Sequence, residues 1–503
     1  MNKRIGKIIV SGVMACTMTA SIMVTAAACG GRTKADFVMP EGGFDTSKNV
    51  EITFSHTMGS NLRDVLDEYI AEFNKIYPNI TVTHEQVGGY DDVRDTILDQ
   101  MVAGNQPNLA YCYPDHVALY NRANAVQTLD DFLPGGAYAD YKVTLQDGTE
   151  VNLGLTQDEV DSFIPGYFNE GYEFGDGTKM YTLPFSKSTE VLYYNEKYFT
   201  DNNLTVPKTW TEMKTLCAKI VELSDADVAA QKAKGVKDDD LLITMPFGYD
   251  SEANWFITMC EQYESPYTSA TGDKYLFDNE QNRKFVKEFK EWYDAGYFTT
   301  QALYGSYTSG LFTNLDKGLR SVMCIGSSAG ASHQAPATVN GSYPFTVGIA
   351  PIPQVETTKP KAISQGPSVC IFKQDDPQEV LASWLFLKFL TTNVDFQAAF
   401  SEASGYIPVL NSETMEKSDA YKAYLADANG GDGLMARAVK VAMEQENAYY
   451  TSPAFVGSSK ARDEVGNLLQ AVFSTKVNSA EELTKLIDDS FKAAVKECEY
   501  FAK

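Results

Sequence analysis

The feature that most constrains the fold is a strand–helix alternation in the first quarter of the chain. Residues 50–56, 80–87 and 108–113 have the length and apolar spacing of strands, and helix-like segments at 61–77 and 90–104 separate them. A strand–helix–strand series places its strands parallel in one sheet, with the helices on the faces of that sheet. The alternation therefore predicts an α/β fold.

A second series of the same kind follows. The apolar run 191–195 is typical of a strand, and the helix after it opens with Thr209 and Glu212 at capping-box spacing. Two further strands are expected at 320–325 and 345–352. Because 503 residues exceed the size of one ordinary core, we expect two lobes.

The chain is strongly acidic, with 67 acidic against 42 basic residues and a formal net charge of −25. A field of this sign repels nucleic acid, so no nucleic-acid partner is expected. It does not exclude an anionic ligand at one local site, where neighbouring donors outweigh a screened distant field. The four histidines have no metal-ligand spacing, so neither a metal nor another cofactor is expected.

The N-terminus has the features of an export signal. A basic region in the first seven residues precedes a long uncharged stretch, and small residues lead up to Cys29. This resembles a bacterial lipobox, and it predicts a lipoprotein signal peptide at 1–28, lipidation of Cys29 and a tether at 29–48. The expected location is the outer face of the bacterial cell membrane, held by the lipid. A plain transmembrane anchor is the alternative, because the uncharged stretch could span a bilayer.

The cysteines do not clearly predict either disulfides or free thiols. The chain has eight cysteines, and setting aside Cys16 and Cys29 leaves six in the body of the protein. An even number in an exported protein favours disulfides. Cys324 and Cys370, however, lie inside apolar strand-like runs, so buried free thiols are expected there.

Residues 326–330 spell G-x-S-x-G, the spacing of the nucleophile elbow in serine hydrolases. Ser328 would then be the nucleophile, and an acid followed by a histidine would have to come well after it. The last histidine, His333, is only five residues away, so no triad fits and no enzymatic activity is expected. Two interpretations of the turn stay open: an anion-receiving turn and a hinge turn of small residues.

Several segments occur in an order that resembles a known family. They are "EFNKIYPNITV", "GNQPNLAYCYPD", "YTLPFSKSTEVLYYN", "PKTWTEM", "RSVMCIGSSAG", "VGIAPIP", "FLKFL" and "SGYIPV". This order is similar to that of the family 1 extracellular solute-binding proteins of bacterial ABC importers. The resemblance implies two α/β lobes of the type II periplasmic-binding-protein-like fold, with a ligand cleft between lobes joined by a multi-strand hinge. It also implies a monomer that binds a small-molecule solute and delivers it to ABC permease subunits, without catalysis.

The resemblance also implies a division of the chain. The N-terminal lobe is expected at 49–185 plus 322–365, and the C-terminal lobe at 186–321 plus 366–503. Crossings between the lobes are expected at "YTLPFSKSTEVLYYN", near "RSVMCIG" and near "AISQGPSV".

Within the family, the likeness is to members that bind glycerol 3-phosphate, and it implies a set of ligand-binding residues. These are Tyr90, Asp115, Ser188, Trp255, Ser327, Ser328, Gly366, Tyr406 and Arg462, with Lys187 as a possible addition. Asp115 would take glycerol hydroxyls. Arg462 would grip the phosphate, for which a planar guanidinium is well suited. A glycerophosphodiester fits the same expectation.

The residues themselves leave alternatives open. Tyr90 could be a surface turn residue, Trp255 a core residue and Arg462 a partner in a salt bridge. Lys187 could simply be solvated. The solute could instead be a sugar or an oligosaccharide stacked on aromatic rings. Outside this class, a secreted hydrolase and a surface adhesin are the alternatives.

Overall fold

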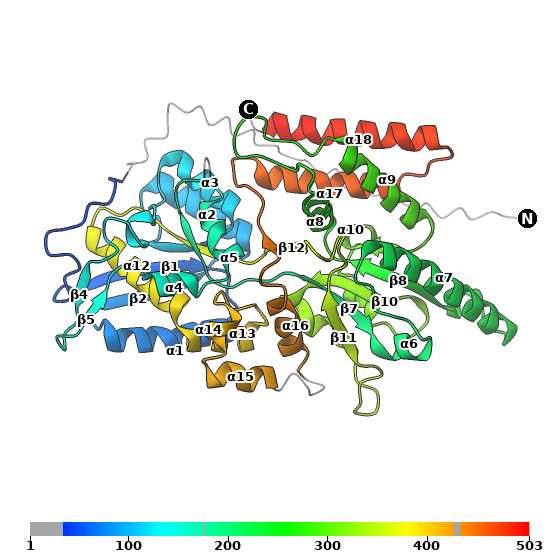
Figure 1. Cartoon of the computed structure of the whole chain (residues 1–503), viewed down its shortest axis with the longest axis horizontal. Coiled ribbons are helices and arrows are strands. Elements are labelled where there is room, and N and C mark those ends of the chain that lie inside the picture. Colours follow the sequence, from blue (N-terminus) through cyan, green and yellow to red (C-terminus); the bar gives the residue numbers. More distant parts are fainter. Residues whose placement is uncertain (1–33, 175–176, 427–432, 502–503) are drawn as a thin grey trace, which may run out of the picture.

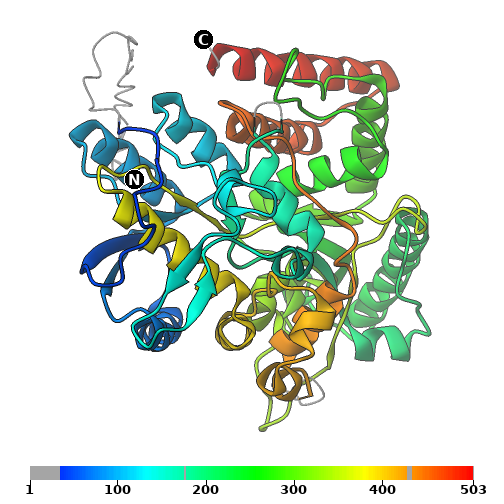
Figure 2. The same cartoon turned by 60° about the vertical axis from the view of Figure 1, so that its left-hand side comes forward.

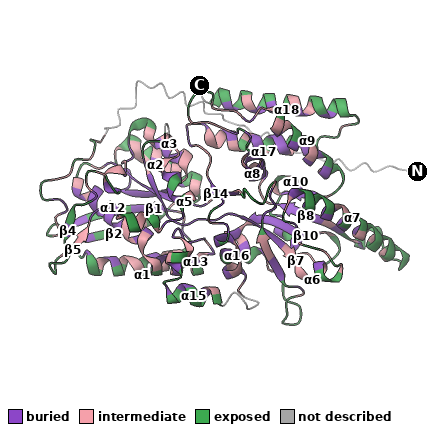
Figure 3. Cartoon of the chain, in the orientation of Figure 1, coloured by how far each residue is buried: buried purple, intermediate pink, exposed green. Residues whose placement is uncertain are grey.

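The computed structural model describes residues 34–174, 177–426 and 433–501. These residues form two α/β lobes, each built on a five-stranded sheet, which lie side by side along the long axis of the molecule (Figure 1). The strands form the buried centre of each lobe, and many helices expose their outer faces (Figure 3). The predicted two-lobed α/β architecture is confirmed.

The N-terminal sheet has the strand order β2-β1-β3-β13-β6. Strand β1 (Val50–His56) pairs in parallel with β2 (Ile80–Gln86) and β3 (Leu109–Cys112), the three strands predicted from the opening alternation. Strand β13 (Ser368–Ile371) pairs antiparallel with β3 and with β6 (Thr182–Pro184). The N-terminal lobe therefore takes strands from distant parts of the chain.

The helices of this lobe cover both faces of its sheet. Helix α12 is apolar on all sides and lies in the core, where Trp384 and Phe386 are fully buried. The helices are α1 (Ser60–Ile76), α2 (Tyr90–Ala103), α3 (Pro114–Tyr120), α4 (Gln157–Asp161), α5 (Pro165–Asn169), α12 (Pro377–Thr392), α13 (Val394–Ser404), α14 (Ser412–Met415) and α15 (Asp419–Ala426). Helix α16 (Leu434–Met443) lies between the lobes and packs against both of them.

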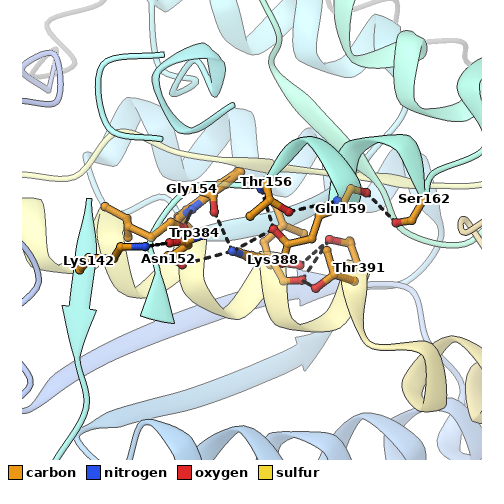
Figure 4. Close-up of polar contacts among 12 residues, drawn as sticks. Lys142, Asn152, Gly154, Thr156, Glu159, Ser162, Trp384, Lys388 and Thr391 are labelled. Carbon is orange, nitrogen blue, oxygen red and sulfur yellow. Dashed lines mark hydrogen bonds and ion pairs between the residues drawn. The ribbon is translucent and has the colours of Figure 1, made fainter. Parts of the chain in front are cut away.

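A short hairpin is fastened to this core. Strands β4 (Lys142–Thr144) and β5 (Glu150–Asn152) lead into a loop that Lys388 holds from α12 (Figure 4). The Lys388 amine donates to the carbonyl oxygen of Gly154 at 2.7 Å and lies 3.2 Å from a Glu159 carboxylate oxygen. Burial lowers the pKa of Lys388. These contacts fix the segment that leads into α4 and α5.

The C-terminal sheet has the strand order β11-β7-β10-β8-β9. Strand β10 (Gly318–Ser327) is central, antiparallel to β7 (Glu190–Asn195) and parallel to β8 (Leu242–Tyr249). Strands β11 (Val347–Pro351) and β9 (Phe298–Thr300) form the two edges.

The strand pairing corrects the expected division of the chain. The segment 322–365 was expected in the N-terminal lobe, but β10 and β11 belong to the C-terminal sheet. Conversely, β13 lies within 366–503, which was expected in the C-terminal lobe, yet it belongs to the N-terminal sheet. Local periodicity predicts that a strand exists but does not say which distant strand it pairs with.

Helices pack on both faces of the C-terminal sheet as well. The predicted capping box opens α7, where Glu212 N–H donates to Thr209 Oγ1 at 3.1 Å. The helices are α6 (Glu196–Asp201), α7 (Trp210–Ala233), α8 (Glu252–Gln262), α9 (Glu280–Asp294), α10 (Gln301–Tyr304), α11 (Ser309–Phe312), α17 (Ser458–Ser474) and α18 (Ala480–Phe501).

Within the described residues, the chain crosses between the lobes three times. The crossings run through 185–189, 352–367 and 444–457, and Figure 2 shows the two lobes that they connect. Ser188 and Gln365 exchange two backbone hydrogen bonds of 2.9 Å, which join the first two crossings. We call these three segments the hinge segments.

The second and third hinge segments are joined in the same way. Strand β12 (Ala362–Ile363) pairs in parallel with β14 (Tyr449–Tyr450). The crossing expected near "RSVMCIG" is wrong, because that sequence forms β10 inside the C-terminal sheet. The hinge segments therefore form one hydrogen-bonded layer between the lobes.

The described part of the predicted tether is packed against the N-terminal lobe. Phe44 is buried in the core of that lobe, and the Lys34 amine lies 2.6 Å from an Asp375 carboxylate oxygen. Residues 34–48 of the segment predicted as a tether therefore pack on the folded lobe. The predicted signal peptide at 1–28 and Cys29 lie outside the described residues. Among the helices of the described ranges, none has both the length and the apolar character needed to cross a membrane.

All six cysteines of the body are buried and unpaired in the described structure. Cys324 lies on β10 and Cys370 on β13, each an interior strand of its sheet. The predicted buried free thiols at these two positions are confirmed.

Candidate functional site

A cavity of about 710 Å³ lies where the two lobes meet the hinge segments. Its size falls in the range of sites for small organic ligands. Residues from both lobes and from two hinge segments line it. They are Gly89, Tyr90, Asp91, Asp92, Tyr113, Pro114, Asp115, His116, Glu170, Ile257, Tyr267, Thr268, Ile363, Ser364, Gln365, Gly366, Thr451, Ser452, Pro453, Ala454, Ser458, Ser459, Arg462 and Asp463.

Two tyrosines and an aspartate form the wall from the N-terminal lobe. Tyr90 is the first residue of α2, and Tyr113 caps α3 at the carboxyl end of β3, where ligands of open α/β sheets bind. Their ring centroids are 4.6 Å apart. Burial raises the hydroxyl pKa of both tyrosines, so they remain neutral donors. Asp115 follows in the first turn of α3.

Arg462 is the cation of the opposite wall. It lies near the start of α17, and its guanidinium donates to Asn254 Oδ1. The N-terminal end of a helix does not favour a positive charge, so Arg462 depends on polar partners there. Among the cavity-lining residues in the described ranges, Arg462 is the only lysine or arginine.

A buried ion pair forms the floor of the cavity. The Lys187 amine lies 2.6 Å from Glu170 Oε1 and also donates to Ser368 Oγ at 3.0 Å. Thr451 donates to the other oxygen of Glu170 at 3.1 Å. Glu170 lines the cavity whereas Lys187, fully buried, lies behind it. Lys187 therefore compensates the charge of Glu170 and does not face the cavity.

Several polar atoms at the cavity are buried without a protein partner. They include the Tyr267 hydroxyl, Thr268 Oγ1 and His116 Nδ1. Burial lowers the pKa of His116, so its ring is neutral near pH 7. Because buried polar groups are almost always hydrogen-bonded, these atoms suit a polar ligand or bound water.

The cavity brings together four of the predicted ligand-binding residues: Tyr90, Asp115, Gly366 and Arg462. These come from four separate segments of the chain. Tyr406 does not line the cavity, but it packs on the same hydrophobic core as Tyr90.

The other predicted residues do not line the cavity. Trp255 is fully buried and stacks on Tyr249 and Phe289 in the core, as the core interpretation held. Ser188 lies in the first hinge segment and contributes backbone hydrogen bonds. These positions were inferred from short motifs, which do not report the direction of a side chain.

Ser327 and Ser328 also have structural roles. Ser327 Oγ accepts from the backbone N–H of Ala329 at 3.3 Å. Ser328 has no exposed surface, and its Oγ accepts from the N–H of Thr189 at 3.2 Å. Of the two interpretations left open for this turn, the described contacts agree with a hinge-side turn rather than an anion-receiving one.

Sequence reasoning missed the remaining polar walls of the cavity. Tyr113 had a usable signal, because it follows a predicted strand directly and precedes a proline that starts a helix. Glu170, Tyr267 and Thr451 had no such signal, since Glu170 lies in a single 3-10 turn and the other two lie in irregular segments, all positioned by distant contacts.

Two α/β lobes, several hinge segments and a polar cavity between them define a two-lobed solute-binding protein. The model of the bacterial extracellular solute-binding protein family matches residues 68–427. The chain belongs to this family, whose members bind solutes and are not enzymes.

The curated relatives match about a third of the chain, whereas the solved structures match most of it. The sn-glycerol-3-phosphate-binding periplasmic protein UgpB of Salmonella paratyphi A is 25% identical over 175 residues, 34% of this chain and 35% of the relative. The same protein of Pectobacterium atrosepticum is 25% identical over 202 residues, 39% of each chain. The matched region thus spans little more than a third of these curated relatives.

The solved structures match over almost the whole chain and support the fold. UgpB from Mycobacterium tuberculosis, in complex with glycerophosphocholine, has a TM-score of 0.62 at 17% identity, covering 90% of this chain and 98% of that one. The sugar-binding protein MalE from Xanthomonas citri has a TM-score of 0.63 at 18% identity, covering 90% and 99%.

Proposed function

We propose that this chain is the substrate-binding component of a bacterial ABC importer and that it captures a glycerophosphodiester. The observation that supports this most directly is the position of Arg462. Its guanidinium lines the same cavity as Tyr90, Tyr113 and Asp115 but comes from the other lobe. A guanidinium binds phosphate oxygens in a bidentate manner. A carboxylate such as Asp115 accepts hydrogen bonds from glycerol hydroxyls.

The charge around the cavity favours a diester over glycerol 3-phosphate itself. Five carboxylates line it, Asp91, Asp92, Asp115, Glu170 and Asp463, against one guanidinium. Glu170 is paired with Lys187, and Asp91 with Arg94 at 2.7 Å, which leaves three carboxylates without an ion-pair partner in the described part of the chain. A phosphomonoester carries close to two negative charges at pH 7, whereas a diester carries one. The diester meets less repulsion.

The relatives support the same class of solute. The curated relatives are named for sn-glycerol 3-phosphate, and the Mycobacterium tuberculosis protein was solved with glycerophosphocholine. A choline group would add a cation, which the tyrosine faces and the surplus carboxylates of this cavity would attract.

A neutral sugar or oligosaccharide is the second candidate. The observation in its favour is the same surplus of carboxylates beside two aromatic rings, since sugars bind through hydroxyl hydrogen bonds and ring stacking. The MalE structure and a cyclic alpha-maltosyl-1,6-maltose binding protein from Arthrobacter globiformis support this alternative.

The cellular setting forms part of the proposal. Lipidation at Cys29 would hold a monomer at the outer face of the cell membrane. Closure of the lobes around the solute would then present it to the permease subunits. Contacts from both lobes to one ligand favour the closed arrangement.

Ligand binding by the Arg462→Ala variant tests the proposal. The wild type should be stabilised by glycerophosphocholine, by about 2.7 kcal/mol at a hundredfold excess over its Kd. Arg462→Ala should weaken the binding roughly 10- to 100-fold, the worth of a hydrogen-bonded charge contact. Thermal unfolding and isothermal titration calorimetry measure the two effects.

Arg283→Ala is the matched control. Arg283 is a part-buried arginine of the same lobe, paired with Asp488 and absent from the cavity wall, so its loss should leave the affinity unchanged. Undiminished binding by Arg462→Ala would contradict the phosphate contact. Stabilisation by maltose or maltotriose, without any by glycerophosphodiesters, would favour the sugar candidate.

A further inference from the structure

A line of hydrogen bonds runs from Arg462 into the interior of the C-terminal lobe. The guanidinium donates to Asn254 Oδ1, and Asn254 Nδ2 donates to Glu190 Oε1 at 2.9 Å. The other carboxylate oxygen of Glu190 accepts from the Tyr249 hydroxyl at 2.6 Å. The Asn254, Glu190 and Tyr249 side chains are almost completely buried and do not line the cavity.

The chemistry of these groups fixes the role of each atom. A guanidinium has only donors, so it must meet the oxygen of the Asn254 amide. The amide nitrogen is then turned toward Glu190, whose Oε1 accepts its hydrogen bond. The line therefore has one consistent assignment in which every contact pairs a donor with an acceptor.

The line also connects the cavity to the hinge segments. Glu190 is the first residue of β7, directly after the first hinge segment, and it pairs with Ser327 of β10. Asn254 lies in the first turn of α8, where its backbone N–H donates to Ser251 Oγ at 3.2 Å. Glu190 is thus held by a strand of the C-terminal sheet, and Asn254 by the capped start of α8.

We propose that Asn254 and Glu190 are positioning residues that hold the Arg462 guanidinium in its ligand-binding orientation. This inference rests on the proposed function only in taking Arg462 as the anion contact. Without the line, a long flexible side chain near the start of a helix would have to be ordered when the ligand binds, and affinity would fall.

A double-mutant cycle between Asn254 and Arg462 tests the inference. Asn254→Ala should weaken glycerophosphocholine binding about tenfold, since a preorganised contact to a charged group is worth roughly that much. In the Arg462→Ala background, the same Asn254→Ala change should have no further effect on affinity. Equal weakening in both backgrounds would overturn the inference, because Asn254 would then act independently of Arg462.

Asn108→Ala is the matched control. Asn108 is a buried asparagine that bridges Thr53 and Glu379 in the N-terminal lobe, away from the cavity. The Asn108→Ala variant should be less stable than the wild type but should bind glycerophosphocholine with the same affinity. If Asn108→Ala weakened binding as much as Asn254→Ala does, a general loss of packing would explain both, and the positioning role would be refuted.

A ligand-free measurement separates this inference from the proposed function. Crystal structures of the wild type and of Asn254→Ala, without any added solute, should show an ordered guanidinium in the first and a displaced or disordered one in the second. An unchanged Arg462 in Asn254→Ala would overturn the positioning role. A wild type that binds no glycerophosphoester would refute the proposed solute, and these two crystal structures would still decide the positioning role.

Discussion

Glu190 is a carboxyl group enclosed by protein on every side. Burial raises its pKa to about 7, against the hydrogen bonds from Tyr249 and Asn254, which lower it. Arg462 lowers it further, whereas Asp250 raises it. Tyr450 is a further titratable neighbour of Glu190, and burial raises the pKa of its hydroxyl well above the usual value, so it stays protonated. Glu190 therefore changes its charge close to neutral pH.

This shift makes the stability of the protein depend on pH. An unfolded glutamate titrates near pH 4.5, so between pH 4.5 and 7 the folded protein binds more protons than the unfolded chain. The contribution of Glu190 to stability is present below pH 4.5 and is lost as the pH rises to about 7. The loss amounts to roughly 3 kcal/mol at 1.36 kcal/mol per pKa unit.

Glu190→Gln should remove the pH dependence that Glu190 gives to the free energy of unfolding. The free energy of unfolding of the variant, relative to wild type, should rise between pH 5 and pH 8, as measured by denaturant titrations at several pH values. Glu413→Gln alters an exposed glutamate and should follow the wild-type curve. A difference between Glu190→Gln and wild type that stays constant with pH would contradict the prediction.

Individual side chains were predictable from sequence where local structure alone positions them. Tyr90 and Asp115 begin helices that follow strands, and both line the cavity. Lys187 and Trp255 belong to equally suggestive motifs, but one lies behind Glu170 and the other lies in the core. Their surroundings come from segments far away in the chain, which no local pattern reports.

At the scale of the elements, the hinge segments pack too closely to admit extra atoms. Gly366 has a φ of +93°, a conformation that favours glycine. A Cβ at this position would lie 2.4 Å from the carbonyl oxygen of Ser186 and 3.0 Å from Lys187 Cα, both backbone atoms of the first hinge segment. The two hinge segments can therefore lie side by side only with glycine at this position.

Gly366→Ala should destabilise the protein much more than a glycine change in open space. Gly296 also has a positive φ, of +75°, but a Cβ there would meet no atom within 4 Å. Gly296→Ala should cost about 1 kcal/mol, the conformational strain alone. Gly366→Ala should cost roughly 2–4 kcal/mol, since overpacking adds to that strain. Denaturant unfolding measures both, and equal costs would contradict the close packing.

The elements themselves were more predictable than their partners. The strands β1 to β3 and the capping box of α7 follow from spacing and end residues, and they form as expected. The sequence did not predict the lobe to which β10, β11 and β13 belong. Each of these strands is apolar, so either sheet could bury it, and the choice depends on long-range pairing.

At the scale of the whole molecule, the acidic surface opposes the ligand that the cavity is proposed to bind. The net charge of −25 repels an anion at a distance, while the part-buried Arg462 attracts it at short range. Salt screens the distant repulsion more strongly than the local contact. A net anionic solute should therefore bind better as salt is added, up to the point at which the local contact is screened as well.

This salt response distinguishes the candidate solutes. Raising NaCl from about 10 mM to 150 mM shortens the screening length from about 30 Å to 8 Å. Stopped-flow association of glycerophosphoglycerol, a diester with a net charge of −1, should become a few fold faster. Association of a neutral sugar should not change, and it serves as the control. An association rate of the diester that falls with salt would contradict the dominance of the long-range field.

The interleaving of the lobes also affects how the protein is made. The N-terminal sheet needs β13, which ends at Ile371, and the core of the C-terminal lobe needs Phe491 and Cys498 from the last helix. A ribosome or an export channel must therefore release most of the chain before either core can close. The connectivity that joins the lobes thus keeps the newly synthesised polypeptide open until segments far along the chain have emerged.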